Sequence, residues 1–355
     1  MANKKVIFLL MLVFVPISVA AKWLDLPPLL IFITSGLAII PLAALIANST
    51  EAIATVIGSA WGGLLNATFG NATEMIISIV ALRAGLVDVV KASLTGAIIA
   101  NLLLALGLAI FLGGLRYSEQ SFQPAVARIN SSSLTLALIV LSTPAAIQFT
   151  SKGLTISTIN NFSYAAAILL LVYYILMLFF SMKTHKYIYS EDVDEATEKS
   201  EGQVNLALSI GILLISTIVL VFVSDILVES IEKTISTLGL TSLFTGVILI
   251  PLFGGIVEYI TCVTFATNNK MELAVGVAIG SSLQIALFVA PALVLVGWAI
   301  GQPMNLNFNP FELVAVAMAV IITNSISNDG RSNWLEGILL LITYAVLGIA
   351  FYFHP

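Results

Sequence analysis

The sequence predicts an all-α polytopic membrane protein with about eleven transmembrane helices. Hydrophobic residues make up 59% of the 355 residues, whereas charged residues make up only 9%. A soluble domain carries about 25% charged residues, so this chain cannot cover a water-facing surface of its size. Long apolar runs also recur along the whole chain. These observations exclude a soluble enzyme, a disordered chain and a fibrous protein.

The predicted helices follow from runs of about 17–25 mainly apolar residues, which are long enough to cross a bilayer. They lie at residues 6–21, 28–47, 61–82, 86–112, 131–149, 160–182, 204–224, 240–267, 271–298, 310–327 and 334–353. The first run resembles a signal peptide, but its length favours a retained N-terminal helix within residues 1–27. The third and eighth runs contain glycine pairs or Gly-Asn together with an acid, so we expect both to break within the membrane.

A charged segment at residues 183–203 interrupts the apolar pattern. It suits either a solvated linker or a regulatory element that senses or attracts cations. Its carboxylates are Glu191, Asp192, Asp194, Glu195, Glu198 and Glu201, and the first five are the candidate regulatory residues. The predicted helices place nine Lys and Arg residues on one side of the membrane and five on the other. Because positive charge favours the cytoplasmic side, the N-terminus and this acidic loop are predicted to be cytoplasmic.

An internal repeat divides the chain. Shifting the sequence by 184 residues places Glu74 on Glu258 and Gly96 on Gly280. The repeats are predicted over residues 28–182 and 204–355, with five helices each. Because five is an odd number, the second copy enters the membrane from the opposite side. This inverted-repeat plan is typical of secondary transporters, whose substrate site lies near the midplane between the copies.

Two glutamates lie well inside predicted helices, where a charge is most costly. An acidic side chain at the centre of a transmembrane helix costs about 2.5–3.5 kcal/mol on insertion scales. Glu74 and Glu258 occupy equivalent positions of the two repeats. Carboxylates that share a cavity of low dielectric repel each other and tend to hold protons unless a cation lies between them. A divalent cation matches their combined charge.

Residues near the two glutamates offer oxygen ligands and points of helix breakage. Calcium takes about six to eight oxygen ligands from carboxylates, amides, backbone carbonyls and water. The candidate side-chain ligands are Asn71, Asn101, Ser281 and Gln284. Backbone carbonyls are expected to be exposed at Gly70, Gly254 and Gly255. The four-residue spacing of Gly70, Glu74 and Ser78 predicts that they share one helix face, as do Gly254, Glu258 and Cys262.

Two long stretches resemble the paired signatures of the cation/proton exchangers, the CAX branch of the calcium:cation antiporters. The first is Gly63–Glu74 with its continuation Val90–Gly96, and the second runs from Gly254 to Trp298. The resemblance covers nearly the whole chain. It implies an antiporter that moves calcium against protons, with Glu74 and Glu258 as cation ligands and proton carriers. It also implies that the second and seventh predicted helices slide against the rest.

The chain departs from this family at two positions. The second signature usually has Asn after the glycine and His after the glutamate, where this chain has Gly255 and Tyr259. The predicted site therefore lacks one amide oxygen and one titratable group. Ion selectivity and the source of the coupling protons stay open, and a sodium/calcium exchanger of the same fold is the alternative.

Other classes of function are disfavoured by the composition. The net charge of −5 gives no reason to expect a nucleic-acid partner, and the single cysteine excludes an intramolecular disulfide. Both histidines lie outside the apolar runs, so no nucleophile–base pair of an intramembrane hydrolase is visible. We therefore expect that the protein is not an enzyme and that it has no cofactor. Membrane lipid and transported cations are the expected partners, a homo-oligomer is left open, and a prokaryotic cell membrane is the expected location.

Overall fold

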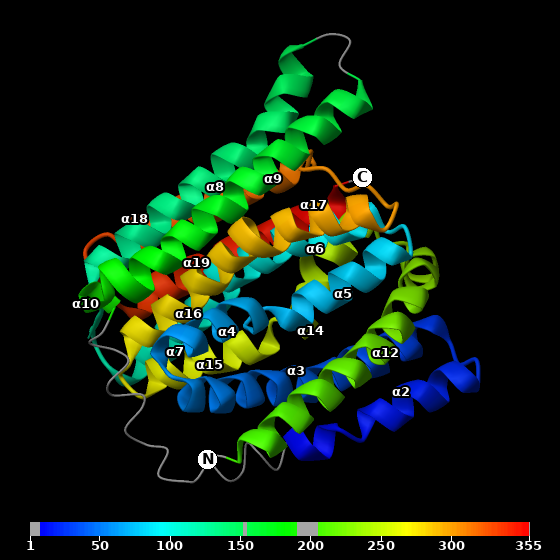
Figure 1. Ribbon diagram of the computed structural model, residues 1–355, viewed down its shortest axis with the longest axis horizontal. Helices are drawn as coiled ribbons and strands as arrows, with labels where there is room; N and C mark the ends of the chain where they lie inside the picture. Colours follow the sequence, from blue (N-terminus) through cyan, green and yellow to red (C-terminus); the bar gives the residue numbers. More distant parts are fainter. Residues whose placement is uncertain (1–7, 152–154, 190–204, 355) are drawn as a thin grey trace.

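The computed structural model describes residues 8–151, 155–189 and 205–354. In these ranges the protein is a bundle of helices, with many of them lying side by side along its longest axis (Figure 1). The acidic residues Glu191, Asp192, Asp194, Glu195 and Glu198 lie outside the described ranges. The predicted all-α class is confirmed.

The elements of the first part of the chain precede the acidic segment. They are α2 (Phe14–Trp23), α3 (Pro28–Ile57), α4 (Ser59–Phe69), α5 (Ala72–Arg83), α6 (Val87–Ile99), η1 (Ala100–Ala105), α7 (Leu106–Arg116), β1 (Gln120–Ser121), α8 (Pro124–Thr150), α9 (Ile156–Phe179), η2 (Phe180–Thr184) and α10 (Lys186–Tyr189). Elements labelled η are π-helical turns. Three of them, η1, η2 and η4, adjoin long α-helices, and η3 lies at the start of a broken helix.

The elements of the second part follow the acidic segment. They are α12 (Leu206–Leu238), α13 (Ser242–Phe244), η3 (Thr245–Leu249), α14 (Ile250–Gly254), α15 (Ile256–Thr267), α16 (Met271–Gln284), η4 (Ile285–Val289), α17 (Ala290–Ala299), α18 (Pro310–Ile326), β2 (Arg331–Ser332) and α19 (Trp334–Phe353). In Figure 1 the rod α16–α17 runs in the opposite direction to the rod α6–α7, as an inverted repeat requires. The repeat itself stays a prediction.

Local sequence signals explain several helix ends. Proline occupies the first turn of α3, α8 and α18, where its missing N–H costs nothing. The side chain of Asn205 accepts from the N–H of Leu208 at the start of α12, which ends at Gly239 in the left-handed conformation. Asn333 and Glu336 form a capping box at the start of α19. Each signal satisfies backbone groups that a helix end leaves unpaired.

Each run predicted to span the membrane coincides with a helix or a broken helix. Within the described ranges, seven helices are long and apolar enough to cross a membrane, and one further pair is bent by 59° between Ser242–Gly254 and Ile256–Thr267. Phe8–Trp23 and Pro310–Ile326 are shorter apolar helices. The total of about eleven spans stays a prediction, since α4 and α5 are short and separate.

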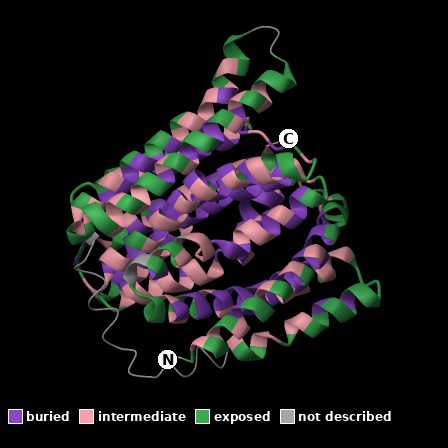
Figure 2. Ribbon diagram, in the orientation of Figure 1, coloured by how far each residue is buried: buried purple, intermediate pink, exposed green. Residues whose placement is uncertain are grey.

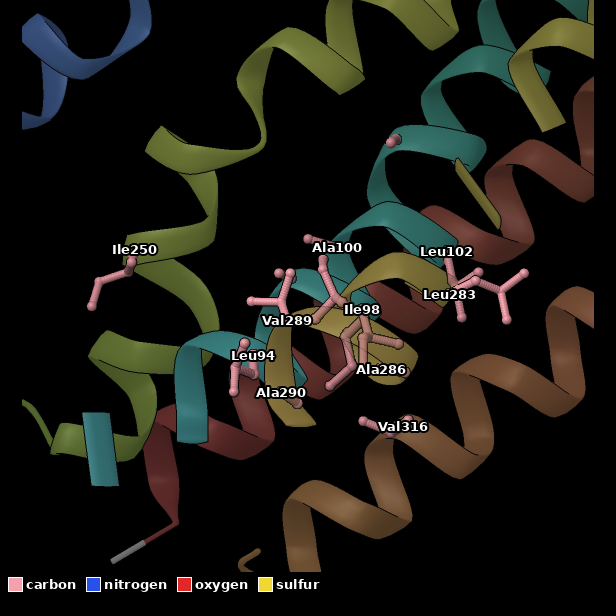
Figure 3. Close-up of a cluster of buried hydrophobic side chains, with 14 of the residues drawn as sticks. Leu94, Ile98, Ala100, Leu102, Ile250, Leu283, Ala286, Val289, Ala290 and Val316 are labelled. Atoms are coloured by element: carbon pink, nitrogen blue, oxygen red, sulfur yellow. The ribbon is translucent and has the colours of Figure 1, made fainter. Parts of the chain in front are cut away.

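The core lies around the two central rods, α6–η1–α7 and α16–η4–α17. Figure 2 shows that buried residues concentrate there, whereas the outer helices α8, α9 and α12 carry many exposed residues. Figure 3 shows Leu94 and Ile98 of α6 close to Ala286, Val289 and Ala290 from the second rod. Exposed apolar residues on the outer helices, such as Phe222 and Ile321, suit contact with lipid.

Two further contacts hold peripheral parts in place. The long helices α3 and α12 pack along each other, and α2 packs on both. An ion pair of 2.6 Å between Lys22 Nζ and Glu229 Oε2 joins the end of α2 to α12. At the other end, β1 and β2 pair antiparallel, which joins the α7–α8 connection to the α18–α19 connection.

Candidate cation-binding site

Two helix breaks bring the two glutamates to comparable positions. The first break lies between α4, which ends at Phe69, and α5, which begins at Ala72. The second lies at Gly255, between α14 and α15. Glu74 and Glu258 each stand in the first turn of the helix that follows the break. Free N–H groups and the helix dipole favour negative charge there, so both breaks create sites suited to a carboxylate.

The breaks contradict one prediction about helix faces. Gly70 lies in the turn before α5, so it does not share a continuous helix face with Glu74 and Ser78. Gly254 ends α14, and the bend of 59° separates it from the face that carries Glu258 and Cys262. The four-residue spacing failed because it assumes an unbroken helix. The glycines provide the break itself, as predicted, and Cys262 is fully buried as a packing residue.

The carboxylates of Glu74 and Glu258 lack the partners that buried charges normally have. Oε2 of each is buried and has no hydrogen-bond partner. The two carboxyl groups lie close enough to interact electrostatically. A Cβ atom placed on Gly254 would lie 3.6 Å from Oε1 of Glu74, so the second break directly faces the carboxylate of the first. Two under-coordinated carboxylates in one buried region form a natural cation site.

Amide side chains complete one side of this region. Asn71 donates through Nδ2 to Oε1 of Gln284, which joins the first break to the last residue of α16. This contact leaves Asn71 Oδ1 buried and without a partner. Gly70 lets the backbone approach the same amide, because a Cβ atom there would lie 3.0 Å from Gln284 Oε1. Asn71 therefore offers a free acceptor oxygen next to the carboxylates.

The other predicted ligands are placed less directly. Asn101 is buried in η1 and Ser281 is half-buried in α16. Within the described ranges neither hydrogen-bonds to Glu74 or Glu258 in this structure. The π-helical turn at Asn101 and the one that begins after Gln284 are features that recur at functional sites.

A small cavity next to Glu74 adds one polar residue, Ser93, that the sequence reasoning did not select. It has a volume of about 10 Å³, close to that of one water molecule, and Ser78, Ser93 and Gly254 are among its lining residues. Ser93 donates to the carbonyl of Val90.

The second break differs from the first in what fills it. The ring of Tyr259 lies over Gly255, where a Cβ atom would come within 2.7 Å of the tyrosine hydroxyl. That hydroxyl donates to the carbonyl of Pro251 at 2.9 Å. The position equivalent to Asn71 therefore carries no amide, and the space is taken by a phenol that binds the backbone.

Comparison with known proteins decides the family. Residues 27–183 and 208–353 match the family of sodium/calcium exchanger proteins. The chain belongs to this family. The exchanger is 54% identical, over 100% of its chain and 98% of the relative, to a protein named "Ca(2+)/H(+) antiporter" from Aphanothece halophytica. It is 38% identical, over 98% of its chain and 99% of the relative, to "Ca(2+)/H(+) antiporter ChaA" of Bacillus subtilis.

Solved structures agree with this placement. The exchanger superposes on native YfkE with a TM-score of 0.85 and 36% identity, over 98% of its chain and 100% of the other. An H⁺/Ca²⁺ exchanger CAX, 14% identical, shares the fold with a TM-score of 0.69. The predicted resemblance to the cation/proton exchanger branch is confirmed, and the exchanger is a multi-pass integral membrane protein.

Proposed function

We propose that this exchanger moves Ca²⁺ in one direction and H⁺ in the other across a membrane by alternating access. The observation that carries the proposal is the pair Glu74 and Glu258, whose carboxylates face one buried region and lack hydrogen-bond partners at Oε2. The names of the relatives, which range from cyanobacteria to Bacillus, support calcium and protons as the exchanged ions.

Calcium binding is proposed to use the oxygen atoms that the two breaks leave free. Glu74 and Glu258 supply charge, and Asn71 Oδ1 supplies a neutral oxygen that is already oriented by its bond to Gln284. Asn101, Gln284 and Ser281 are proposed to join by small side-chain movements. Backbone carbonyls at Gly70, Gly254 and Gly255 and water complete the shell that calcium requires.

Coupling follows from competition for the same carboxylates. Without a cation, two neighbouring carboxyl groups in an apolar region hold protons, because burial and mutual repulsion both disfavour their charged forms. Calcium can bind only when those protons leave, and protons can return only when calcium leaves. The site therefore cannot bind Ca²⁺ and these protons at the same time, and the gradient of one ion drives the transport of the other.

The moving parts are proposed to be α3 and α12, which pack along each other and correspond to the second and seventh predicted helices. We place the N-terminus and the acidic residues Glu191, Asp192, Asp194, Glu195 and Glu198 in the cytoplasm from the distribution of Lys and Arg. A regulatory role for that segment is proposed on its charge alone. We also propose residues 28–182 and 204–355 as inverted repeats, with residues 1–27 as a separate N-terminal helix.

The remaining features of the proposal concern class and setting. We propose that the protein is a transporter with no enzymatic activity and no resident cofactor, since Ca²⁺ and H⁺ are cargo. Lipid is the proposed partner of the exposed apolar helices, and the cell membrane of a prokaryote is the proposed location. A homo-oligomer stays open.

Transport in proteoliposomes with an imposed pH gradient and no sodium tests the proposal. The wild-type protein should accumulate Ca²⁺ against its gradient, while Glu74→Gln and Glu258→Gln should show none above empty vesicles. Glu232→Gln is the matched control, because the same substitution is made at an exposed position of α12. Normal exchange in both site variants would refute the proposal. Flux that needs sodium would instead identify a sodium/calcium exchanger, a reading that Tyr259 in place of a histidine leaves open.

A further inference from the structure

A third buried carboxylate lies far from the break residues in sequence, at the start of α18. Glu312 is only 2% exposed, which makes it the most buried acidic residue among those described. The sequence analysis did not select it; it stands in the first turn of an apolar helix, where a carboxylate suits the helix dipole. Burial of an acid in a membrane protein is costly, so a partner or a function is required.

The contacts of Glu312 are insufficient for a permanent charge. Oε2 accepts from the hydroxyl of Thr95 at 3.2 Å. The single Thr95 proton also has the carbonyls of Lys91 and Ala92 within 3.2 and 3.1 Å, so it is shared among three acceptors. No ion pair among the described residues includes Glu312. A carboxylate here therefore has one long and shared hydrogen bond and the electrostatic attraction of Lys91, whose ammonium group is bound to Asn305 and Asn307 instead, so its charge is poorly stabilised.

The same contacts suit a protonated carboxyl group. Its O–H can donate to the Thr95 oxygen, while the Thr95 proton turns to the carbonyl of Ala92. Each group then donates one hydrogen bond and no acceptor is contested. The arrangement is complete when Glu312 carries a proton and incomplete when it does not.

Water can reach this carboxyl group from a large cavity. Glu312 lines a cavity of about 690 Å³ together with Asp88, Gln148, Thr241 and Asn309. The cavity lies at the beginning of α6 and α18 and the end of α8, which is the opposite end of the bundle from α10 (Figure 1). A proton can therefore pass between Glu312 and this cavity without any movement of the residues of the central site.

The charges around the cavity favour a proton over a divalent cation. Lys91 also lines it, and its ammonium group is held by Asn305 Oδ1 at 2.7 Å and the carbonyl of Asn307 at 2.9 Å. The exposed Asp88 faces it from α6, and His354, which follows α19, stacks on Phe311 beside Glu312. The ammonium group of Lys91 is fixed in place and repels Ca²⁺. Together, the carboxylates of Asp88 and Glu312 and the ammonium group of Lys91 have a net charge of −1, which the binding of one proton neutralises.

We propose that Glu312 is a proton-binding site of the exchanger that opens to the cavity at this end, separate from the Glu74 and Glu258 pair. Its carboxylate takes a proton from hydronium in the cavity and releases water, and the reverse step returns the proton. Thr95, which contacts Glu312, precedes Gly96, and Gly96 packs against Val247 of η3. A change in the protonation of Glu312 therefore affects the contact between α6 and η3, which closes this end of the central site. Only this link to transport rests on the proposed function.

Carbodiimide modification of the wild-type protein tests the site directly, because this reagent reacts with protonated carboxyl groups in apolar surroundings. Modification of Glu312, read by mass spectrometry of its peptide, should increase about tenfold for each unit of falling pH until the carboxyl is fully protonated. The exposed Asp88 is the internal control and should stay nearly unmodified. Modification of Glu312 that does not change with pH would overturn the proposal, and suppression by sodium or potassium at fixed pH would identify a metal-cation site instead.

Transport measurements separate this site from the central pair. Glu312→Gln should abolish most of the dependence of the rate on the pH of the cavity side, while the number of protons released when Ca²⁺ is added should stay as in the wild type. Glu232→Gln, the same substitution at an exposed position of α12, is the matched control and should keep the wild-type pH profile. An unchanged pH profile in Glu312→Gln, or a loss of the proton release caused by Ca²⁺, would contradict a separate site. Thr95→Val should also weaken the dependence of the rate on pH, but less than Glu312→Gln does.

Discussion

Two helix seams beside the central site correspond in the predicted repeat but are packed differently. In the first, η3 lies along α6, and the helix face at Ala92 and Gly96 is fully buried. In the second, the corresponding face of α16 carries Gly276 and Gly280, and a Cβ atom at either glycine would meet nothing within 4 Å. A Cβ atom at Gly96 would instead lie 2.2 Å from the carbonyl oxygen of Val247.

The helix that corresponds to η3 and α14 explains the open seam. This is α4, which packs against α3 and leaves Trp61 and Leu64 exposed. One seam is closed and the other open, so the structure is asymmetric in the way that one state of an alternating-access cycle requires. Because α16 begins at the same end of the bundle as α10 (Figure 1), the open seam lies at the end proposed to face the cytoplasm. In the opposite state we expect α4 to close on Gly276 and Gly280.

Filling the open seam should have the largest effect on transport. The Cβ atom of Gly280→Leu would meet nothing within 4 Å in this state, but the side chain would obstruct α4 in the opposite one. Overpacking of that state by about 1–3 kcal/mol makes it roughly five- to 150-fold rarer. Exchange in proteoliposomes should fall accordingly, while the melting temperature of the purified protein stays near that of the wild type. Wild-type exchange in this variant would show that α16 is not a closing surface.

Crowding the closed seam should have a smaller effect, on stability. Gly96→Ala places a methyl group against the Val247 backbone, which cannot rotate away. We expect a cost of about 1–3 kcal/mol and a lower melting temperature in detergent. An unchanged melting temperature would mean that the α6–η3 contact is looser than the structure indicates.

The smallest effect is expected at the corresponding open position. Gly276 is exposed in the middle of a helix with nothing within 4 Å of an added Cβ atom. Gly276→Ala should therefore raise stability by at most about 1 kcal/mol, through helix propensity alone. The contrast with Gly96→Ala is the internal control, since both variants add one methyl group to equivalent helices. Equal destabilisation by both would remove the asymmetry between the seams.

The sequence was a good guide where local rules act alone. Apolar length located the helices, and glycine pairs with an acid located both breaks. The repeat identified Glu74 and Glu258 as a pair without any structure. The face assignment of Gly70 and Gly254 failed, because a break ends the periodicity on which the assignment depends.

Contacts between distant segments could not be predicted. The Asn71–Gln284 pair joins residues 213 positions apart, and the Thr95–Glu312 contact joins residues 217 positions apart. Lys91 likewise donates to Asn305 Oδ1 and to the carbonyl of Asn307, more than 200 positions away. No spacing rule within one helix encodes such pairs, since they depend on how the rods pack.

The central claim is that the carboxylates of Glu74 and Glu258 hold either protons or Ca²⁺. Equilibrium binding of Ca²⁺ to the purified protein at a series of pH values tests it most directly, together with the protons released into weakly buffered solution. The Kd should rise about tenfold per unit of falling pH for each proton displaced, and Ca²⁺ should acidify the solution. Glu74→Gln and Glu258→Gln should lose both effects. A Kd that is independent of pH, with no proton release from the wild-type protein, would contradict the claim.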